Sequence, residues 1–518
     1  MMPGTPVNTE APLVVDGLKS YFLTLDGVAK VLTRLTFNLN KSEILGVFGE
    51  SRSGKTAAAN SIVDLLRSPG YIVGGAVYIE RFNIFRDVKK LDKLGAAISS
   101  GKEKKSSLRG LKQQEEILRL LRGKTITLVS EDAHASLNPM QSIGNQFLEA
   151  ILSQNTSEIC QSVINREEFT LEDVERLIST VEQQPDLLGR KRIIRQWMTD
   201  HAIFSTRGII INAFDFKYGQ EDLAQEVFSI ASTEKSKTDL DEVRRVKSIF
   251  DLHSRIGKLN VDLVHATADK DSELVKDIQA DLSNSVGKLK ELGSFEKTQR
   301  SLLKGSKHSF IRDIAVQYAA NLLRDFGVEE TDSLLTSYPH ELGNVLKQKI
   351  ALALAFSIRP RIVILDEPTE SFDVSTKLKI LSSIKEEQRS RNDLSILIFS
   401  KDLTILSAIS DRVLVMYSGN VIEESTIDVL IHDSKHPFTS GVINTFEAAE
   451  RVSDKTVKLE YTQGFSPDFV DPPRGCRFNP RCKFRMDMCS IKKPLLSPVA
   501  EGHKVACFLY SEAVEEER

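Results

Sequence analysis

The feature that most constrains the fold is the segment EILGVFGESRSGKT at residues 43–56. A short apolar run ends in glycine, the motif G-x-x-x-x-G-K-S/T follows, and TAAANSIVDLLR continues with apolar residues at helical spacing. This order predicts a strand, a tight loop and a helix. In such a loop, glycines let backbone N–H groups surround a phosphate, and the dipole of the helix N-terminus favours the anion.

The loop is therefore predicted to hold a nucleotide through Gly49, Glu50, Ser51, Arg52, Ser53, Gly54, Lys55 and Thr56. Lys55 places a cation on the β- and γ-phosphates, and the Thr56 hydroxyl is offered to Mg²⁺. The alternative is a glycine- and serine-rich loop that fits the motif by chance. The strand pattern before the loop and the helix pattern after it favour phosphate binding.

A second apolar run, RIVILDEP at residues 361–368, ends in the carboxylates Asp366 and Glu367. A carboxylate at the end of a buried strand can hold Mg²⁺ directly or through water, so we expect Asp366 to bind the metal. We expect Glu367 to polarise the attacking water as a general base. The alternative is a pair of exposed acids that cap the next helix, which a second apolar strand beside a phosphate loop makes the weaker interpretation.

Strand and helix patterns alternate along much of the chain. Residues 10–80 alternate apolar and polar side chains, which predicts twisted strands, and residues 412–424 predict a hairpin that turns at Ser418-Gly419-Asn420. The Lys-rich residues 87–115 are typical of a solvated loop. Because strands and helices alternate again after the helical residues 151–312, we predict a mainly parallel sheet with ligand chemistry at its strand ends.

Composition excludes some classes of protein. The 518 residues are 41% hydrophobic and 27% charged, as in ordinary globular proteins, and the net charge of -3 provides no overall basic surface for nucleic acid. The longest apolar run, Ile350 to Ile358, is far shorter than the roughly 20 residues of a membrane-spanning helix. The N-terminus lacks the pattern of a secretory signal. We therefore expect a cytosolic chain that meets a membrane only through a partner.

Four of the five cysteines lie in the last tenth of the chain: Cys476, Cys482, Cys489 and Cys507. In a reducing compartment such a cluster indicates a metal site or an iron–sulfur cluster before disulfides. Four thiolates suit a 4Fe–4S cluster or Zn²⁺, and the long gaps between the cysteines disfavour structural zinc. Arg474 and Arg481 flank the group and are expected to offset the charge of a tetrathiolate cluster. The alternative is a set of reduced structural thiols.

Several stretches resemble the ATPase subunit of an ABC transporter, and more narrowly the oligopeptide/dipeptide importer branch. The stretches that carry this resemblance are GVFGESRSGKT, SLNPMQSIGNQFLEA, SYPHELG, LDEPTESFD, HPFTSGV and DPPRGCRFNPRC. The resemblance covers about residues 12–150 and 310–510 and leaves the helical stretch between them unmatched. Some members of the branch carry the C-terminal cysteine pattern with an iron–sulfur cluster, which favours a 4Fe–4S cluster over Zn²⁺ here.

The resemblance implies an α/β P-loop ABC ATPase domain with a mainly parallel sheet core, an antiparallel N-terminal β subdomain and a helical subdomain. A large helical insertion and a small cysteine-containing C-terminal region would be added to it. We expect four segments: 1–150 with the P-loop and Q-loop, 151–312 as the helical insertion, 313–430 with the signature, Walker B, D-loop and switch region, and 431–518 as a peptide-importer-type extension.

The resemblance also implies partners. Two ATPase subunits would dimerise head to tail, and each ATP would lie between one P-loop and the signature helix of the other subunit. Two transmembrane permease subunits and an extracytoplasmic peptide-binding protein would complete the importer, with this chain peripheral at the cytoplasmic face of the cell membrane. Tyr21 falls where the family stacks a ring on adenine, and Asp373 falls on the D-loop that crosses the dimer interface. The alternatives are a half-buried strand tyrosine and a helix N-cap.

Three positions depart from the family pattern. In place of LSGGQ, the chain has LGNVL at 342–346, which removes a hydroxyl and puts side chains where bare backbone approaches the nucleotide. The switch-histidine position holds Lys401, which can neutralise a phosphate but cannot orient water as an imidazole can. The Q-loop glutamine position holds Glu131, which can contact Mg²⁺ or its waters but adds negative charge near the phosphates. The nearby His134 is expected to be a loop histidine and not a replacement.

These departures predict an ATP-binding subunit that binds MgATP, hydrolyses it slowly and acts in peptide uptake with a different, less altered ATPase subunit. Glu367 and Lys401 are the expected catalytic residues. The first alternative is a non-hydrolysing partner with a structural or regulatory role in the same transporter. The second is a soluble ABC protein that is unconnected to membranes, against which the single P-loop and the permease-facing SLNPMQSIGNQF segment both count.

Overall fold

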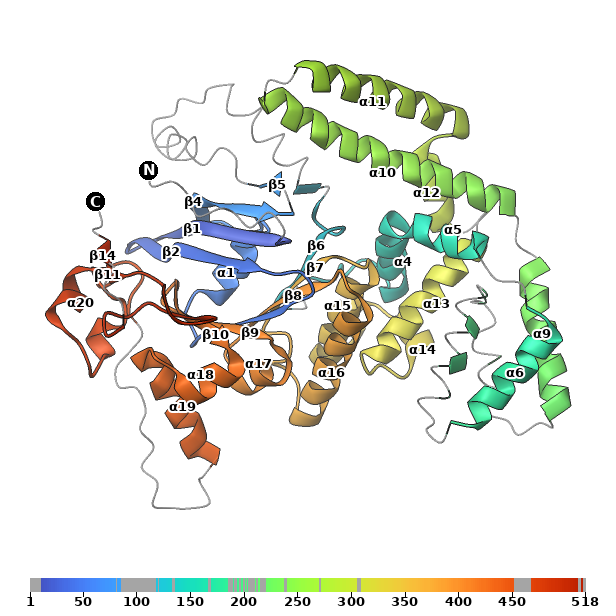
Figure 1. Ribbon diagram of the computed structural model, residues 1–518. Helices are drawn as coiled ribbons and strands as arrows, with labels where there is room; N and C mark the ends of the chain where they lie inside the picture. The colour runs from blue at the N-terminus through green and yellow to red at the C-terminus, as the bar shows by residue number, and fades with distance from the viewer. Residues whose placement is uncertain are drawn as a thin grey trace. The chain divides into compact units, whose positions relative to one another are not determined.

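The chain divides into two compact units in the computed structural model (Figure 1). One unit comprises residues 1–136 together with 360–518, and the other comprises residues 137–359. The structure describes residues 11–80, 82–84, 118–119, 121–132, 136–165, 169–184, 220–236, 240–269, 272–304, 309–450, 467–510 and 514–515, with single residues and pairs between 190 and 214. The Lys-rich segment expected to be a solvated loop, and His134, lie outside these residues.

In the described part of the first unit, the main sheet has eight strands in the order β12-β13-β10-β9-β3-β8-β7-β6. Five of them form its parallel core: β9 (Arg412–Tyr417), β3 (Ile44–Phe48), β8 (Ser395–Ser400), β7 (Ile362–Asp366) and β6 (Ile126–Val129). Every residue of β3, β7 and β8 is buried, as expected of parallel strands that are covered on both faces. The predicted mainly parallel sheet is confirmed, and the loops after β3 and β7 leave the same edge of it.

Antiparallel strands complete the sheet on the β9 side. They are β10 (Asn420–Thr426), β13 (His503–Val505) and β12 (Ser497–Ala500). The predicted hairpin is confirmed, because β9 and β10 pair antiparallel around Ser418 and Gly419. Strand β13 pairs with β10, so residues near the C-terminus extend the sheet that carries the phosphate loop.

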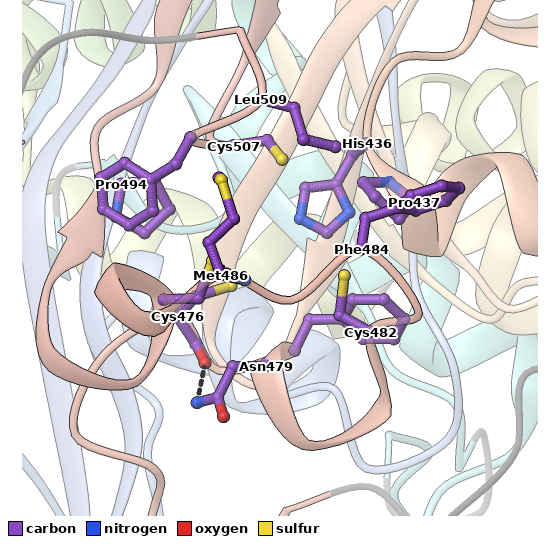
Figure 2. Close-up of a pocket in the computed structure, with 13 residues that line it drawn as sticks. His436, Pro437, Cys476, Asn479, Cys482, Phe484, Met486, Pro494, Cys507 and Leu509 are labelled. Carbon is purple, nitrogen blue, oxygen red and sulfur yellow. Dashed lines mark hydrogen bonds between the residues drawn. The ribbon is translucent and has the colours of Figure 1, made fainter.

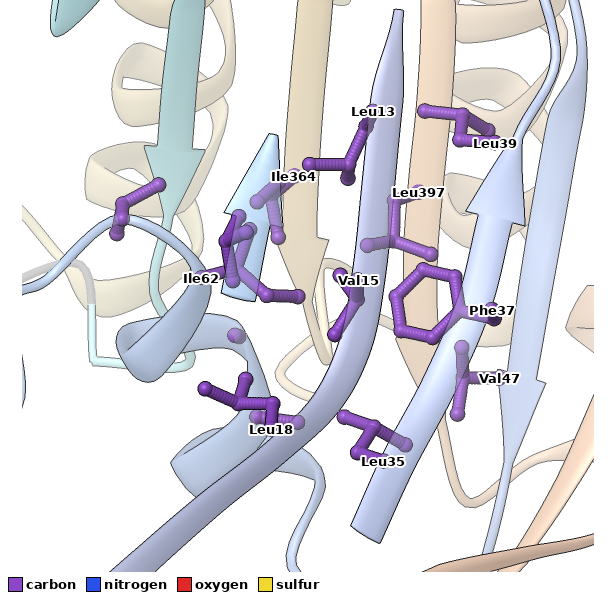
Figure 3. Close-up of a cluster of buried hydrophobic side chains, with 14 of the residues drawn as sticks. Leu13, Val15, Leu18, Leu35, Phe37, Leu39, Val47, Ile62, Ile364 and Leu397 are labelled. Atoms are coloured by element: carbon purple, nitrogen blue, oxygen red, sulfur yellow. The ribbon is translucent and has the colours of Figure 1, made fainter. Parts of the chain in front are cut away.

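The second sheet of this unit is antiparallel, in the order β2-β1-β4-β5. Its strands are β1 (Leu13–Thr24), β2 (Gly27–Leu39), β4 (Gly70–Ile79) and β5 (Phe82–Asn83). Alternate side chains of β1 and β2 point into a shared core with β3, β7, β8 and helix α1 (Lys55–Ile62) (Figure 3). Leu13, Val15 and Phe37 meet Ile364 and Leu397 there (Figure 3). This packing fixes the strand and the helix that flank the phosphate loop.

The remaining elements of the first unit follow the main strands. They are α16 (Val374–Ser390), α17 (Leu403–Ile409), α18 (Ile427–Asp433), α19 (Pro437–Glu450), the 3₁₀ helix η3 (Asn479–Arg481), α20 (Asp487–Ile491), β11 (Lys493–Pro494) and β14 (Val514–Glu515). The fully buried carboxylate of Glu423 on β10 joins several of them. It accepts hydrogen bonds from the backbone N–H groups of Lys435 and His436 at 2.6 and 3.1 Å, and its Oε1 lies 2.8 Å from His503 Nε2.

The second unit is helical. Its elements are α4 (Ile143–Gln154), α5 (Thr156–Ile164), α6 (Leu171–Glu182), α9 (Gln220–Ser236), α10 (Leu240–Asp269), α11 (Ser272–Leu292), α12 (Phe295–Lys304), α13 (Ser309–Asp325), α14 (Thr331–Thr336), η2 (Pro339–Glu341) and α15 (Asn344–Ser357). Helices α10 and α11 run side by side (Figure 1). The prediction of helices within residues 151–312 is therefore confirmed for the described part of that stretch. Among the helices described in either unit, none has the length and apolarity needed to span a membrane.

Candidate nucleotide site

The loop at residues 49–54 turns tightly between β3 and α1. Gly54 has a φ of 100° at the N-cap of α1, a conformation that favours glycine. A Cβ on Gly49 would lie 2.5 Å from Ser53 Oγ and 2.7 Å from the carbonyl oxygen of Met416, so only glycine fits there. The loop is closed by a hydrogen bond of 3.1 Å from the Ser53 N–H to the carbonyl of Glu50. The glycines of the motif are thus required by the local backbone.

Lys55 lies inside this loop. Its Nζ donates to the carbonyl oxygens of Gly49 and Glu50 at 2.7 and 3.2 Å and lies 3.5 Å from Glu367 Oε1. The residue is only 6% exposed. Burial lowers the pKa of Lys55, and the neighbouring Glu367 carboxylate opposes that shift. The structure therefore brings together the predicted phosphate-binding lysine and the predicted general base, from segments more than 300 residues apart in the sequence.

Asp366 ends β7 in a fully buried position. Among the residues that the structure describes, neither of its carboxylate oxygens accepts a hydrogen bond of good geometry, and the buried hydroxyl of Ser53 also has no partner. Burial raises the pKa of Asp366 from an ordinary 3.8 to about 7, although the Thr56 hydroxyl lies close enough to oppose the shift. A buried carboxylate without a partner costs several kcal/mol unless a cation joins it. Asp366 beside the Thr56 hydroxyl is an oxygen donor set that suits Mg²⁺.

Glu367 is held in an uncommon backbone conformation at the strand end. Its φ is 47°, in the left-handed region, and its N–H donates to the carbonyl of Phe399 at 2.9 Å. The side chain is buried, and Ser400 Oγ donates to its Oε2 at 3.4 Å. Strained conformations of this kind persist where surrounding structure fixes them and often mark functional sites. The alternative of two exposed acids at the end of β7 does not apply, because both side chains are buried.

Lys401, at the switch-histidine position, is paired with an acid that the sequence analysis did not identify. Its Nζ forms an ion pair with Glu370, and Glu370 in turn hydrogen-bonds the side chain of Glu131. The ion pair raises the pKa of Lys401 and lowers that of Glu370. Burial and the contact with Glu370 raise the pKa of Glu131. Two of the three departures from the family pattern therefore meet in one network through Glu370.

The other predicted residues take varied places. Ser51, Arg52 and Thr56 are exposed, and Tyr21 is half-buried on β1 opposite Tyr71 of β4. Asp373 is the N-cap of α16, where it accepts hydrogen bonds from Thr376 N at 3.0 Å and from the hydroxyls of Ser375 and Thr376 at 2.7 Å. These hydrogen bonds lower the pKa of Asp373. The N-cap interpretation of Asp373 is thus confirmed, and its D-loop role stays a prediction.

The four C-terminal cysteines line one pocket (Figure 2). Its other walls are largely apolar and include Phe478, Phe484, Met486, Pro494, Phe508 and Leu509 together with His436. Burial raises the pKa of the Cys476 thiol to about 12 and that of Cys507 to about 11, and it also raises that of Cys482. All four are free thiols. Across the described residues, no group of three or more His, Cys, Asp or Glu side chains is close enough to coordinate a metal ion.

Arg481 has partners that the sequence analysis did not predict. Its guanidinium pairs with Glu50 of the phosphate loop and donates to the Tyr417 hydroxyl at 3.2 Å. Its expected role of offsetting charge at the cysteines stays a prediction. Sequence reasoning missed this pairing because the partners are 431 positions apart. Glu370 was missed for a related reason: its partner Lys401 lies 31 positions away, although an acid close to Glu367 and a lysine in place of histidine were both visible.

In the second unit, the departure from LSGGQ lies at the start of α15. Gly343 is the N-cap and offers no side-chain cap to the first helical N–H groups. Gly343, Asn344 and Val345 are exposed, and Val345 is 44% exposed. Upstream, Met140 of the SLNPMQSIGNQF segment is 84% exposed, and Ser142 caps α4 by accepting from Asn145 N at 3.4 Å. The first N–H groups of α15 are thus available to a ligand or to water.

Comparison with known proteins agrees with these motifs. Residues 32–370 match the model of the ABC transporter family, and residues 422–489 match that of the oligopeptide/dipeptide transporter C-terminal region. The oligopeptide transport ATP-binding protein AppD of Bacillus subtilis is 36% identical over 198 residues, which are 38% of this chain and 59% of AppD. The dipeptide transport ATP-binding protein DppD of Escherichia coli is 31% identical over 191 residues, which are 37% of this chain and 57% of DppD.

The alignments therefore span less than two thirds of the length of these relatives. Among solved structures, a bacterial ABC transporter cassette in dimeric form aligns with a TM-score of 0.37 and 13% identity, over 80% of this chain and 98% of the cassette. The family match covers well over half of the chain and includes both the phosphate loop and the acids at the end of β7. The chain belongs to the ABC transporter family.

Proposed function

We propose that this chain is the ATP-binding subunit of a membrane importer for peptides, and that it binds MgATP and hydrolyses it slowly. The observation that carries the proposal is the convergence of Lys55, Asp366 and Glu367 beside the loop at 49–56. Membership of the ABC transporter family supports ATP as the nucleotide. Similarity to proteins named for oligopeptide and dipeptide transport supports peptides as the cargo of the complex.

Each group in the site has a proposed task. Lys55 neutralises the β- and γ-phosphates, and the loop's backbone N–H groups and the start of α1 add further favourable dipoles. Thr56 and Asp366 hold Mg²⁺, which supplies charge neutralisation at the phosphates. Glu367 accepts a proton from the attacking water, and its buried position next to Lys55 fixes its carboxylate. Tyr21 stacks on adenine, and Asp373 reaches the dimer interface.

Slow hydrolysis is supported by the network around Glu370. Lys401 would have to leave its ion pair with Glu370 before it could neutralise a γ-phosphate. Glu131 adds a carboxyl group to the same network, and Lys401 cannot orient water as the usual histidine would. The site therefore keeps the groups that bind MgATP while the groups that assist turnover are altered.

A different ATPase subunit is the proposed partner, because the start of α15 lacks the serine and the bare glycines of LSGGQ. The partner's nucleotide would meet the exposed Asn344 and Val345 instead. Two permease subunits and an extracytoplasmic peptide-binding protein complete the proposed importer, with the chain peripheral at the cytoplasmic face of the membrane. The exposed Met140 lies in the segment proposed to contact a permease.

The cysteine pocket is the proposed site of a 4Fe–4S cluster, with Zn²⁺ as the alternative occupant. Support comes from the four thiols that line one apolar pocket and from the family match at 422–489, which includes all but Cys507. Among the described residues these thiols are not close enough together to coordinate a metal ion, so binding would require them to move toward one another. Because burial raises the thiol pKa values, binding must displace protons to form thiolates. Metal analysis of the purified chain, with a Cys482→Ser variant, tests this: iron with visible absorbance supports it, and equimolar zinc without iron overturns it.

Nucleotide binding to the purified chain tests the central proposal. We expect a fluorescent ATP analogue to bind with Mg²⁺ and to lose at least about 100-fold in affinity in Lys55→Met, which removes the buried cation and leaves Glu367 without its partner. Circular dichroism confirms that the variant is folded. Equal affinity of the variant and the wild type would refute a nucleotide site at this loop.

The partner proposal is tested in the complex purified from membranes. Turnover should fall to a low level when the catalytic glutamate of the partner ATPase is replaced, and it should change little in Glu367→Gln of this chain. Vigorous turnover that survives the change in the partner would contradict slow hydrolysis here. Equal turnover by this chain alone, as a homodimer, would remove the need for a different partner.

A further inference from the structure

The phosphate loop contains an acid at its second position. Glu50 follows Gly49 directly, and its side chain is 34% exposed. Its backbone carbonyl accepts a hydrogen bond from Lys55 Nζ, so its backbone takes part in the loop geometry. A negative charge at this position opposes the binding of a phosphate unless another group neutralises it. The loop therefore needs a counter-charge for its own glutamate.

Arg481 supplies that charge. Its NH1 lies 3.0 Å from Glu50 Oε2 and its NH2 lies 3.4 Å from Oε1, so the guanidinium addresses both carboxylate oxygens. The Arg481 side chain is only 7% exposed, and its guanidinium carbon lies 5.7 and 5.9 Å from the ring centroids of Tyr417 and Phe478. These ring contacts and the hydrogen bond to the Tyr417 hydroxyl orient the guanidinium of Arg481 without a ligand.

The arginine comes from the cysteine-rich segment. It ends the 3₁₀ helix η3 and directly precedes Cys482. This helix is anchored to the first cysteine, because Asn479 donates to the Cys476 carbonyl from its backbone N–H at 3.0 Å and from its side chain at 2.7 Å. The position of the guanidinium is thus set by residues that also line the cysteine pocket.

We propose that Arg481 is a positioning residue of the nucleotide site, through which the cysteine-rich segment neutralises Glu50 and orients the phosphate loop. The inference rests on the proposed binding of a nucleotide at this loop. It assigns to the C-terminal segment a direct electrostatic role in that binding. Loss of Arg481 removes this counter-charge from Glu50 beside the phosphates, whereas loss of both side chains removes the charge and its counter-charge together.

A double-mutant cycle separates this role from a purely structural one. The affinity of a fluorescent ADP analogue is measured for the wild type, Arg481→Gln, Glu50→Gln and the double variant. We expect Arg481→Gln to weaken binding about 3- to 10-fold in the wild-type background and less than about 2-fold in the Glu50→Gln background. The loss of affinity caused by Arg481→Gln in the wild-type background should decrease between 0.05 and 0.5 M salt, because salt screens the repulsion between Glu50 and the phosphates.

Arg481→Lys gives a second measurement in case the glutamine variant is unfolded. It keeps the charge without the fork, so an intermediate loss is expected in the wild-type background and none in Glu50→Gln. Equal losses in both backgrounds, or no loss in either, would overturn the inference. Lys55→Met distinguishes the two levels: if wild type and Lys55→Met both fail to bind, the nucleotide site itself is refuted. If only Lys55→Met fails while the arginine variants bind normally, only the role of Arg481 is refuted.

Discussion

The buried carboxylate of Asp366 makes a quantitative prediction about stability and pH. Its pKa is about 7 in the folded protein and 3.8 as an ordinary value, chiefly because of burial. Glu131 and Glu367 raise the pKa further, while Thr56 and Lys55 oppose the shift. An acid whose pKa is raised in the folded state lowers the free energy of unfolding when it ionises. This loss of stability is absent below about pH 4, grows between pH 4 and 7, and is complete above pH 7.

The magnitude follows from the separation of the two pKa values. About three pH units at 1.36 kcal/mol each give a cost of about 4 kcal/mol at pH 8, and the linkage relation leaves less than half of it at pH 5. Asp366→Asn cannot ionise. We therefore expect the free energy of unfolding of Asp366→Asn, minus that of the wild type, to rise by about 2–3 kcal/mol between pH 5 and pH 8.

The assay is urea unfolding at pH 5, 6, 7 and 8 without nucleotide or Mg²⁺. Unfolding of the first unit is monitored by hydrogen exchange of peptides from β7 and β8. Trp197, the single tryptophan, lies in the other unit, and its fluorescence reports separately on the unfolding of that unit. Asp428→Asn removes an exposed carboxylate from α18 and is the matched control. A difference that stays flat from pH 5 to 8, or falls, would refute the reasoning from burial. MgATP should stabilise the wild type and have much less effect on Asp366→Asn.

Two further predictions follow from the site and the core. Glu370→Gln frees Lys401 from its ion pair, so the affinity for ATP should increase about 3- to 10-fold relative to that for ADP, as measured by competition binding; an unchanged ratio would contradict the role of the pair. Ile364→Ala removes a fully buried side chain from β7 and should lower the free energy of unfolding of the first unit by about 2–5 kcal/mol, measured by the same hydrogen-exchange assay; a loss below 1 kcal/mol would show that the core between the two sheets relaxes around the cavity.

The parts of this protein that the sequence predicted well are encoded locally. The strand, the glycine loop and the helix at residues 43–56 are contiguous, and the run into Asp366 and Glu367 is one strand with its end. Motif spacing therefore predicted both halves of the candidate site, which the structure brings together. Their meeting at one sheet edge followed from the general rule for parallel strands.

The contacts that were not predicted join distant segments. The guanidinium of Arg481 pairs with Glu50, which is 431 positions away in the sequence. Glu370 lies in the loop after β7 and pairs with Lys401, which follows the neighbouring strand β8. No local pattern distinguishes such partners from ordinary surface charges. The pairing of Lys401 with Glu370 could have been predicted from the sequence, because an unusual lysine in a predicted active site needs a nearby acid.

The position of β3 in the sheet has a consequence for how the protein is made. Strand β3 is complete by residue 48, yet both neighbours to which it pairs, β8 and β9, begin only after residue 394. At about 5–20 residues per second, a ribosome needs roughly 20–70 seconds to deliver them. During that interval the apolar strand before the glycine loop has two open edges, a state that invites wrong pairing. A chaperone that shields the nascent N-terminal region should therefore increase the yield of folded protein more than one that acts after release.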